Sequence, residues 1–555
     1  MKKYRGFAAG VVTTGALLLF IQAKPVDSYF EISKNLDIFT NIFKELNTYY
    51  VDPIEPGKLV KTGVDAMLED LDPYTNYYTE SDIEEYEFQT TGKYGGIGAN
   101  MRKKDDLVQV GEVHEDGPAH KAGLHPGDQL IAVDNQSVKG KSLDDISLLL
   151  KGAPGTQVTL KVKDFYTGLE SSKIITRGEI EVSSVPFYSL VGPNKDVAFV
   201  RLTQFTPGCS RLVKNALDSM RQAKPQLAGV VLDLRNNPGG LLDEAVSICN
   251  LFTDAGQLVV STKGKVKEWD KDFATQGKAW DNKIPVAVLI NHSSASASEI
   301  VAGTLQDLDR GVVIGERSYG KGLVQVTKTL GYNARLKLTT AKYYTPSGRC
   351  IQALDYSHRN EDGSVGFVPD SLKQEFKTKN GRKVLSGGGV EPDVAVENTE
   401  ISKLAVTLYV KSYFFDYANQ YAKQHPNIAP AGSFALSKED FSAFSKWLEN
   451  KDYSYKTETE IVLDSLKAIA NREKYFDAIQ TDYKALQTKV SHDKNQDLLK
   501  HQQEITELLE NEIVSRYYYL KGRIENGLKH DKDFDTALEL IAKPDKYSAL
   551  LQPKK

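Results

Sequence analysis

The sequence predicts an α/β protein of several domains, with helical regions at both ends of the chain. Residues 196–200 and 229–233 are apolar runs typical of strands buried on both faces, and helical spacing follows each of them. Only three of the 42 glycines fall after residue 400, where Lys, Glu, Leu and Tyr are abundant. This composition predicts an all-helical C-terminal appendage of about 150 residues.

Composition excludes several classes of protein. The chain has 555 residues, with 70 Lys and Arg against 74 Asp and Glu, so its formal charge of −4 argues against a nucleic-acid partner. Its three cysteines are too few for a disulfide framework and too scattered for a zinc site. No metal or cofactor is expected, because the histidines form no metal-binding or triad pattern.

The N-terminus has the pattern of an export signal. Basic residues at positions 2, 3 and 5 precede an uncharged apolar run over residues 7–21. A signal peptidase prefers small residues at the −3 and −1 positions, and Ile21-Gln22-Ala23 meets this only at Ala23. We therefore expect export to a bacterial periplasm or cell envelope, and leave open cleavage or anchoring of residues 1–24 in the inner membrane.

The local pattern of apolar residues and glycines divides the rest of the chain into regions. Residues 25–90 have helical apolar spacing, residues 91–170 combine short strands with glycine turns, and residues 171–400 alternate strands with helices. The helical region covers residues 401–555. The oligomeric state, including a homo-oligomer, is left open by these patterns.

A glycine-rich turn in the second region suits the binding of a carboxylate. It leads into the strand pattern at residues 107–110, and Gly-x-x-x-Gly-Asp-x-Leu spacing follows over residues 123–130. Residues 94–162 resemble a PDZ domain, and this resemblance implies capture of a polypeptide by its C-terminus. The implied peptide-binding residues are Tyr94, Gly95, Gly96, Ile97 and Gly98.

Two strand-to-helix junctions in residues 171–400 could support a reaction. In the first, residues 229–233 run into Gly239 and Gly240, and free N–H groups at a helix start can stabilise a developing anion. In the second, four serines at residues 293–298 follow an apolar strand. The spacing of Ser296 and Glu299 also fits a capping box, and physical reasoning alone does not say which serine reacts.

Lys321 lies between two glycines in an otherwise apolar region. The preceding residues nearly match a phosphate-binding loop, but Gly322 replaces the required hydroxyl and a strand follows instead of a helix. Burial would lower the pKa of the lysine, so that its neutral amine could remove a serine proton. Strand periodicity places Gln325 on the same face, where it could hold the amine by a hydrogen bond.

Together these segments resemble the C-terminal processing peptidases, or tail-specific proteases, a family of Ser/Lys proteases. The resemblance covers about residues 30–397 and implies a core of the crotonase/Clp type with an inserted PDZ domain. It assigns Ser296 as nucleophile, Lys321 as general base and Gln325 as the assisting residue. The implied oxyanion donors are Ala297 and one of the glycines Gly239 and Gly240.

The function expected from this resemblance is an exported serine endopeptidase that cleaves unfolded or tailed proteins. The alternative is a catalytically silent PDZ scaffold that binds peptide C-termini in the envelope, and a third reading is an acyl-CoA enzyme of crotonase type. His292 is the rival base, because it lies four residues before Ser296. Asp307 lies ~16 Å along the helix from Ser296, so we expect it to form a structural ion pair or cap.

Overall fold

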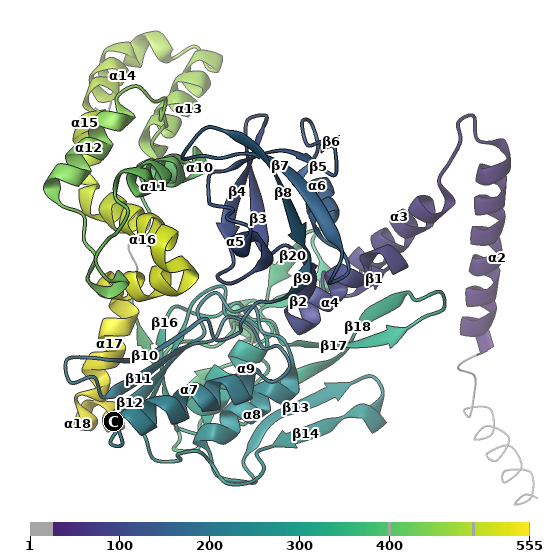
Figure 1. Ribbon diagram of the computed structural model, residues 1–555. Helices are drawn as coiled ribbons and strands as arrows, with labels where there is room; N and C mark the ends of the chain where they lie inside the picture. The colour runs from purple at the N-terminus through teal and green to yellow at the C-terminus, as the bar shows by residue number, and fades with distance from the viewer. Residues whose placement is uncertain (1–25, 398–400, 491–493, 554–555) are drawn as a thin grey trace, which may run out of the picture.

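The computed structural model describes residues 26–397, 401–490 and 494–553. A central α/β domain lies below a smaller β-domain, and the C-terminal helices contact both (Figure 1). The arrangement confirms the predicted mixed α/β architecture with helical regions at both ends. The apolar N-terminal run at residues 7–21 lies outside the described residues.

A mostly parallel sheet forms the centre of the α/β domain, with strand order β10-β11-β12-β15-β16-β23. β10 runs antiparallel to β11, and the later pairs are parallel. Every residue of β12 and β15 is buried, which explains their continuous apolar sequences. The strands cover Phe187–Val191, Val197–Arg201, Gly229–Asp233, Val286–Ile290, Val312–Gly315 and Val394–Ala395.

Helices cover both faces of this core sheet. One face packs against α7 (Cys209–Ala223), α8 (Leu242–Phe252) and α9 (Ala297–Asp307). The other face packs against α17 (Lys532–Ile541) and α18 (Pro544–Leu550), which come from the far end of the chain.

The end of the C-terminal region is therefore part of the core and not of a separate appendage. Phe534 and Ile541 share an apolar cluster with Phe199 and other sheet residues. The Tyr547 hydroxyl donates to the Val286 carbonyl (3.0 Å) and accepts from the Val286 N–H (2.9 Å). A parallel sheet needs cover on both faces, and this chain supplies the second layer from its last residues.

An antiparallel sheet lies beside the core sheet and carries the segment that follows Lys321. Its order is β1-β18-β13-β14, and β17 also pairs with β18. The strands are Asn76–Tyr78, Leu258–Gly264, Lys271–Ala274, Leu323–Thr329 and Arg335–Tyr344 for β1, β13, β14, β17 and β18.

The smaller domain is a sheet of order β3-β4-β5-β7-β8, with β6 paired to β5. The chain enters and leaves it through β2 (Lys93–Gly96) and β9 (Gly178–Glu181), which pair antiparallel, so the domain is an insertion. Its strands and helices are Ala99–Lys104 (β3), Leu107–Val113 (β4), Gln129–Val133 (β5), Gln136–Ser137 (β6), Gln157–Lys163 (β7), Glu170–Thr176 (β8), Pro118–Lys121 (α5) and Leu143–Leu150 (α6).

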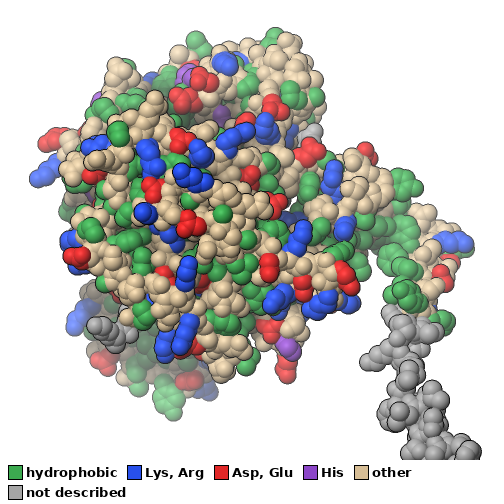
Figure 2. All heavy atoms as spheres, turned by 90° about the horizontal axis from the view of Figure 1, so that it is seen from below, with side chains coloured by type: hydrophobic (Ala, Val, Ile, Leu, Met, Phe, Trp, Pro, Cys, Tyr) green, Lys and Arg blue, Asp and Glu red, His purple; other side chains and the backbone are tan. Residues whose placement is uncertain are grey.

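The N-terminal helices form an arm that projects from the body (Figure 1). They are α2 (Val26–Tyr49) and α3 (Pro56–Glu69), and the next helix, α4 (Ile83–Thr91), lies against β2 of the body. The predicted helical spacing is present in α2, but Leu36 and Phe39 are exposed, and Figure 2 shows hydrophobic side chains along this arm. Within the described ranges, no helix is both long and apolar enough to cross a membrane.

The remaining C-terminal helices build a cluster of their own. Aromatic residues such as Phe414 and Phe444 form its centre, together with Leu509 and Ile513 of the long helix α16. The helices are Lys403–Val410 (α10), Tyr413–Gln424 (α11), Lys438–Leu448 (α12), Glu458–Arg472 (α13), Phe476–Val490 (α14), Lys494–Lys500 (α15) and Gln502–Gly527 (α16).

Candidate active site

Ser296 occupies a strained turn between β15 and α9. β15 ends at Ile290, and Ser296 is the residue immediately before the helix. Its φ of 53° and ψ of −113° lie outside the regions that a side chain normally allows. Such a conformation costs about 1–3 kcal/mol and persists only where the surrounding structure enforces it, most often at functional sites.

The structure distinguishes the four serines of this junction. Ser294 and Ser298 are buried, and their hydroxyls donate to the carbonyl oxygens of Leu234 and Asn237, both at 2.9 Å. Ser293 and Ser296 are half-buried, and of the four only Ser296 has a positive φ. Two serines therefore fix the turn, and Ser296 is the serine with the strained backbone conformation that is common at functional sites.

Glu299 joins the segment of Ser296 to that of Lys321. Its fully buried carboxylate accepts the backbone N–H of Ser296 (2.8 Å) and of Lys321 (2.9 Å). It also accepts the Gly320 N–H (2.7 Å) and the Ser318 hydroxyl (2.5 Å). Burial raises the pKa of Glu299 to about 7, although the hydrogen bonds oppose this rise. The sequence identified Glu299 only as a capping residue, because its partners at 318–321 are remote in the chain.

The glycines beside Lys321 allow another segment to pack closely. A side chain at Gly320 would place its Cβ 2.4 Å from the Ala353 Cβ, and one at Gly322 would lie 2.8 Å from the Gln352 N. Lys321 Nζ lies 4.4 Å from the centre of the Tyr74 ring, which comes from the N-terminal region. The lysine is therefore half-buried among segments that are distant in sequence.

Burial and, to a smaller extent, the nearby charge of Lys337 together lower the pKa of Lys321 to about 8, although Glu299 and Asp72 oppose this change. Within the described residues, Lys321 Nζ has no hydrogen-bond or ion-pair partner and is not bonded to Ser296 Oγ. A lysine with this pKa is substantially neutral near pH 8, which is the state required of a general base.

The predicted contact between Gln325 and Lys321 is absent from the described residues. Gln325 Nε2 donates instead to Thr339 Oγ1 (3.1 Å). The alternation argument fails because β17 begins only at Leu323, and its register with β18 shifts between Val324 and Gln325. An assisting role for Gln325 stays a prediction from the family resemblance.

The three predicted oxyanion donors differ in their surroundings. The Gly239 N–H donates to Asn237 Oδ1 (2.9 Å), and a Cβ at Gly239 would lie 2.7 Å from the Ser296 Cβ. Gly239 therefore permits close packing against Ser296, while its own N–H is occupied. Among the described residues, the N–H groups of Gly240 and Ala297 have no acceptor, and these two remain free for a bound oxyanion.

Of the predicted peptide-binding residues, Tyr94, Gly95 and Gly96 end strand β2, and Ile97 and Gly98 form the turn before β3. The carbonyls of Gly95, Ile97 and Gly98 accept from Gly152, Ala119 and His114, respectively. The N–H groups of Ile97 and Gly98 have no acceptor within the described part of the chain. Among the described strands β3 pairs only with β4, so its other edge is open to an added strand next to these donors.

The rival base His292 and the acidic residue Asp307 each have partners of their own. His292 is exposed and pairs with Glu316 (3.0 Å). Asp307 is buried in an ion pair with Arg349 (2.9 Å) and also accepts from the Thr345 hydroxyl, which confirms the predicted structural role. The sequence did not identify Tyr74, Lys337 or the hydroxyl of Tyr343, which donates to the Ser296 carbonyl (3.2 Å).

Three family models match different parts of the chain. The model of peptidase family S41 matches residues 196–357, a PDZ-domain model matches residues 109–164, and the model "Probable PDZ-protease, C-terminal helical domain" matches residues 404–541. Residues of the first match include Ser296 and Lys321.

Individual relatives are similar over much of the chain. The carboxy-terminal-processing protease of Bartonella bacilliformis is 37% identical over 378 residues, which are 68% of this chain and 83% of the relative. A probable CtpA-like serine protease of Staphylococcus aureus is 36% identical over 61% of this chain and 67% of its own length. The photosystem II D1 C-terminal processing protease is 26% identical with a TM-score of 0.35, over 65% of this chain and 92% of that structure.

The fold and the matches together define a PDZ-containing protease. The chain belongs to the carboxy-terminal-processing proteases of peptidase family S41.

Proposed function

We propose that this protein is an exported serine endopeptidase in which Ser296 is the nucleophile and Lys321 is the general base. The observation that carries the proposal is the shared attachment of both residues to the buried Glu299 carboxylate. One residue is a serine in a strained turn, and the other is a lysine whose pKa is lowered to about 8. A binding scaffold would need neither feature.

In the proposed reaction, neutral Lys321 takes the hydroxyl proton of Ser296 as Oγ attacks the substrate carbonyl carbon. The negative charge on the carbonyl oxygen is stabilised by the free N–H groups of Gly240 and Ala297. The tetrahedral intermediate then collapses, the peptide C–N bond breaks, and the leaving amine takes the proton from Lys321. Water activated by the neutral lysine hydrolyses the acyl-enzyme and restores Ser296.

Substrate selection is assigned to the PDZ domain. A substrate C-terminal carboxylate would accept from the N–H groups of Ile97 and Gly98, and its preceding residues would pair with the open edge of β3. Such backbone pairing requires an extended chain, so unfolded or tailed polypeptides are the expected substrates. The N-terminal basic and apolar pattern supports export to the cell envelope.

The test is cleavage of an unfolded protein that carries an apolar C-terminal tail, with the tail either free or amidated. Wild type is expected to cleave the free form faster, and Ser296→Ala to lose at least about 10⁴-fold in kcat with either form. Ser293→Ala is the matched control from the same junction and should retain activity. Equal cleavage by Ser296→Ala would contradict the assignment, and equal cleavage of both substrate forms would contradict C-terminal recognition.

The activity is expected to rise with pH through about 8, because the neutral fraction of Lys321 grows as the pH passes its lowered pKa. Ionisation of Glu299, whose pKa is about 7, contributes to the same limb, since only the carboxylate accepts all its donors. Replacing Lys337 with glutamine removes a charge that lowers the pKa of Lys321.

The Lys337→Gln variant should therefore reach half-maximal kcat at a higher pH than wild type, which a pH–rate profile measures. A midpoint that stays fixed, or moves to lower pH, would show that Lys321 does not set this limb. Exposed Lys342 on the same strand provides the control variant Lys342→Gln, which should leave the midpoint unchanged.

A further inference from the structure

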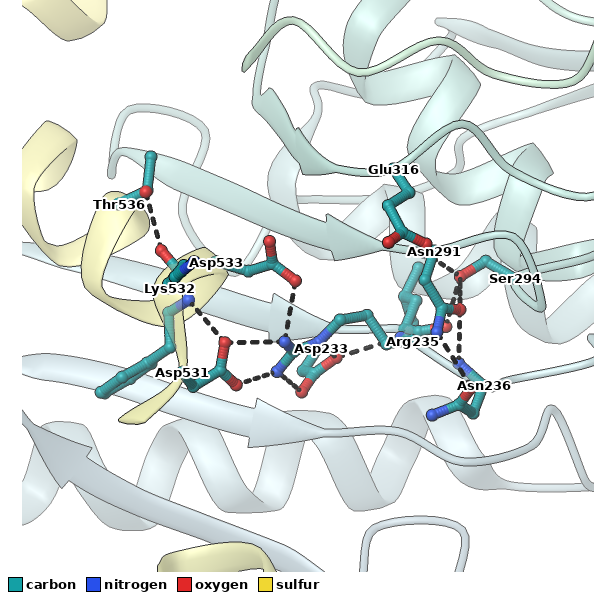
Figure 3. A network of polar contacts seen from close by, with 12 residues as sticks. Asp233, Arg235, Asn236, Asn291, Ser294, Glu316, Asp531, Lys532, Asp533 and Thr536 are labelled. Carbon is teal, nitrogen blue, oxygen red and sulfur yellow. Dashed lines mark hydrogen bonds and ion pairs between the residues drawn. The ribbon is translucent and has the colours of Figure 1, made fainter. Parts of the chain in front are cut away.

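A buried cluster of charges joins the C-terminal helix α17 to the core sheet (Figure 3). Arg235 Nη2 lies 2.5 Å from Asp531 Oδ2, and Arg235 Nη1 lies 2.9 Å from Asp533 Oδ2. The guanidinium also contacts Asp233, the last residue of β12, at 2.8 Å. The side chains of Arg235 and Asp531 are each 14% exposed and that of Asp533 is 3% exposed, so the contacts are largely shielded from solvent.

Arg235 begins the turn that leads from β12 to Gly240. Its N–H donates to Asp233 Oδ1 (3.0 Å), and its carbonyl accepts from Arg201 Nη2 (2.8 Å). The next residue, Asn236, has a φ of 58°, so the turn starts in a left-handed conformation. Both the backbone and the side chain of Arg235 are therefore fixed at the point where the turn begins.

The same turn is bonded to the turn of Ser296. Asn236 and Asn291 exchange two hydrogen bonds: the Asn236 N–H donates to Asn291 Oδ1, and Asn291 Nδ2 donates to Asn236 Oδ1, both at 2.9 Å. The Ala295 N–H donates to the Asn237 carbonyl (3.0 Å). These bonds fix the position of the free Gly240 N–H relative to Ser296. A displacement of the first turn would break this relation and move the N–H away from its place relative to Ser296.

Stability alone does not account for charged residues at this position. One carboxylate oxygen of Asp533 accepts from Arg235, and the other is buried without a hydrogen-bond partner among the described residues. Buried ion pairs are often no more stabilising than apolar side chains of similar size. An apolar contact would cover the sheet equally well, but it would not fix the direction of the Arg235 guanidinium.

We propose that Asp531 and Asp533 are positioning residues for catalysis, which act through Arg235 on the turn that carries Gly240. The inference rests on the proposed function of Ser296 and adds a role for the C-terminal region in the reaction. If the carboxylates of Asp531 and Asp533 are removed, only the stabilisation of the tetrahedral intermediate should weaken. Binding of the substrate and of its C-terminus should not change, because the PDZ turn at residues 94–98 is built from other contacts.

The experiment compares Asp531→Asn, Asp533→Asn and the double variant with Asp535→Asn in the full chain. Asp535 is an exposed residue of the same helix and has no contact with Arg235, so it is the matched control. Five quantities are measured: kcat per serine labelled at the end point by a fluorophosphonate, KM, the inhibition constant of a peptide boronic acid, the pH midpoint and the melting temperature. The boronic acid reports on tetrahedral binding because it forms a tetrahedral adduct with a reactive serine.

We expect kcat and boronate affinity to fall together by roughly 10–100-fold in the double variant, because a displaced donor no longer meets the oxyanion. KM and the pH midpoint should match those of the control. Because kcat is expressed per labelled serine, protein that fails to fold does not enter the comparison. If the double variant is unstable, the single variant Asp531→Asn provides a milder change, since Asp531 is the more exposed of the two residues.

Unchanged kcat and boronate affinity per labelled serine would overturn the inference, as would a fall in kcat with boronate affinity intact. A wild type without Ser296-dependent cleavage would instead contradict the proposed function, so the two failures are distinguishable. A lower melting temperature with normal kinetics per labelled serine would assign the cluster a structural role only and would also overturn the inference.

Discussion

Replacing Lys321 with methionine is expected to reduce kcat for cleavage by at least about 10³-fold, because it removes the proposed general base. His292, the rival base, is exposed and pairs with Glu316. Methionine keeps the apolar stem and removes an amine whose burial disfavours its charged form, so the folded state should not be weakened.

The measurement is kcat on an unfolded substrate together with the melting temperature. Lys342→Met changes an exposed lysine on β18 and serves as the control. Activity of Lys321→Met within tenfold of wild type would remove the lysine from the mechanism. A large fall in melting temperature would mean that the lysine is needed for folding, and the loss of activity would then not be evidence for a base.

The second large effect is expected from Phe534→Ala on α17. Phe534 is buried against the core sheet, and its ring makes an edge contact with Phe199 at 5.5 Å between centroids. Truncation of a buried phenylalanine costs about 3–5 kcal/mol, since it removes apolar contacts and leaves a cavity. This is a large part of the 5–15 kcal/mol that is typical of a folded domain.

Urea unfolding, followed by a probe in the core domain, measures this cost. Tyr475→Ala is the control, because Tyr475 lies between α13 and α14 and is 67% exposed. If the core unfolded at the same urea concentration in Phe534→Ala and wild type, α17 would not be an integral layer of the core. That result would leave the C-terminal helices as a separate appendage, as the sequence alone had indicated.

The sequence predicts the core strands well because their surroundings are uniform. β12 is buried at every position, so its apolar composition identifies it without knowledge of its neighbours. The layer formed by α17 could not be predicted in the same way. Its apolar face indicates burial, but not that the buried surface belongs to strands more than 200 residues earlier, such as β15.

The candidate site shows the same division between local and long-range information. Ser296 and Lys321 lie in short motifs that could be recognised in the sequence. The structure shows in addition that the backbone of Ser296 is strained and that Lys321 is partly buried. The predicted contact of Gln325 is absent because the register of β17 with β18 shifts just before it, and periodicity cannot reveal such a shift. Gly239 and Gly240 are equivalent in sequence, but only the structure shows that Asn237 occupies one of their N–H groups.

The most direct test of the proposed mechanism is to identify the residue that reacts as the nucleophile. The protein is treated with a fluorophosphonate at pH 8, where the amine of Lys321 is substantially neutral, and the adduct is located by peptide mass spectrometry. We expect a stoichiometric adduct on Ser296 that is lost in Lys321→Met and retained in Lys342→Met. An adduct on Ser293, Ser294 or Ser298, or labelling of Ser296 that does not depend on Lys321, would contradict it.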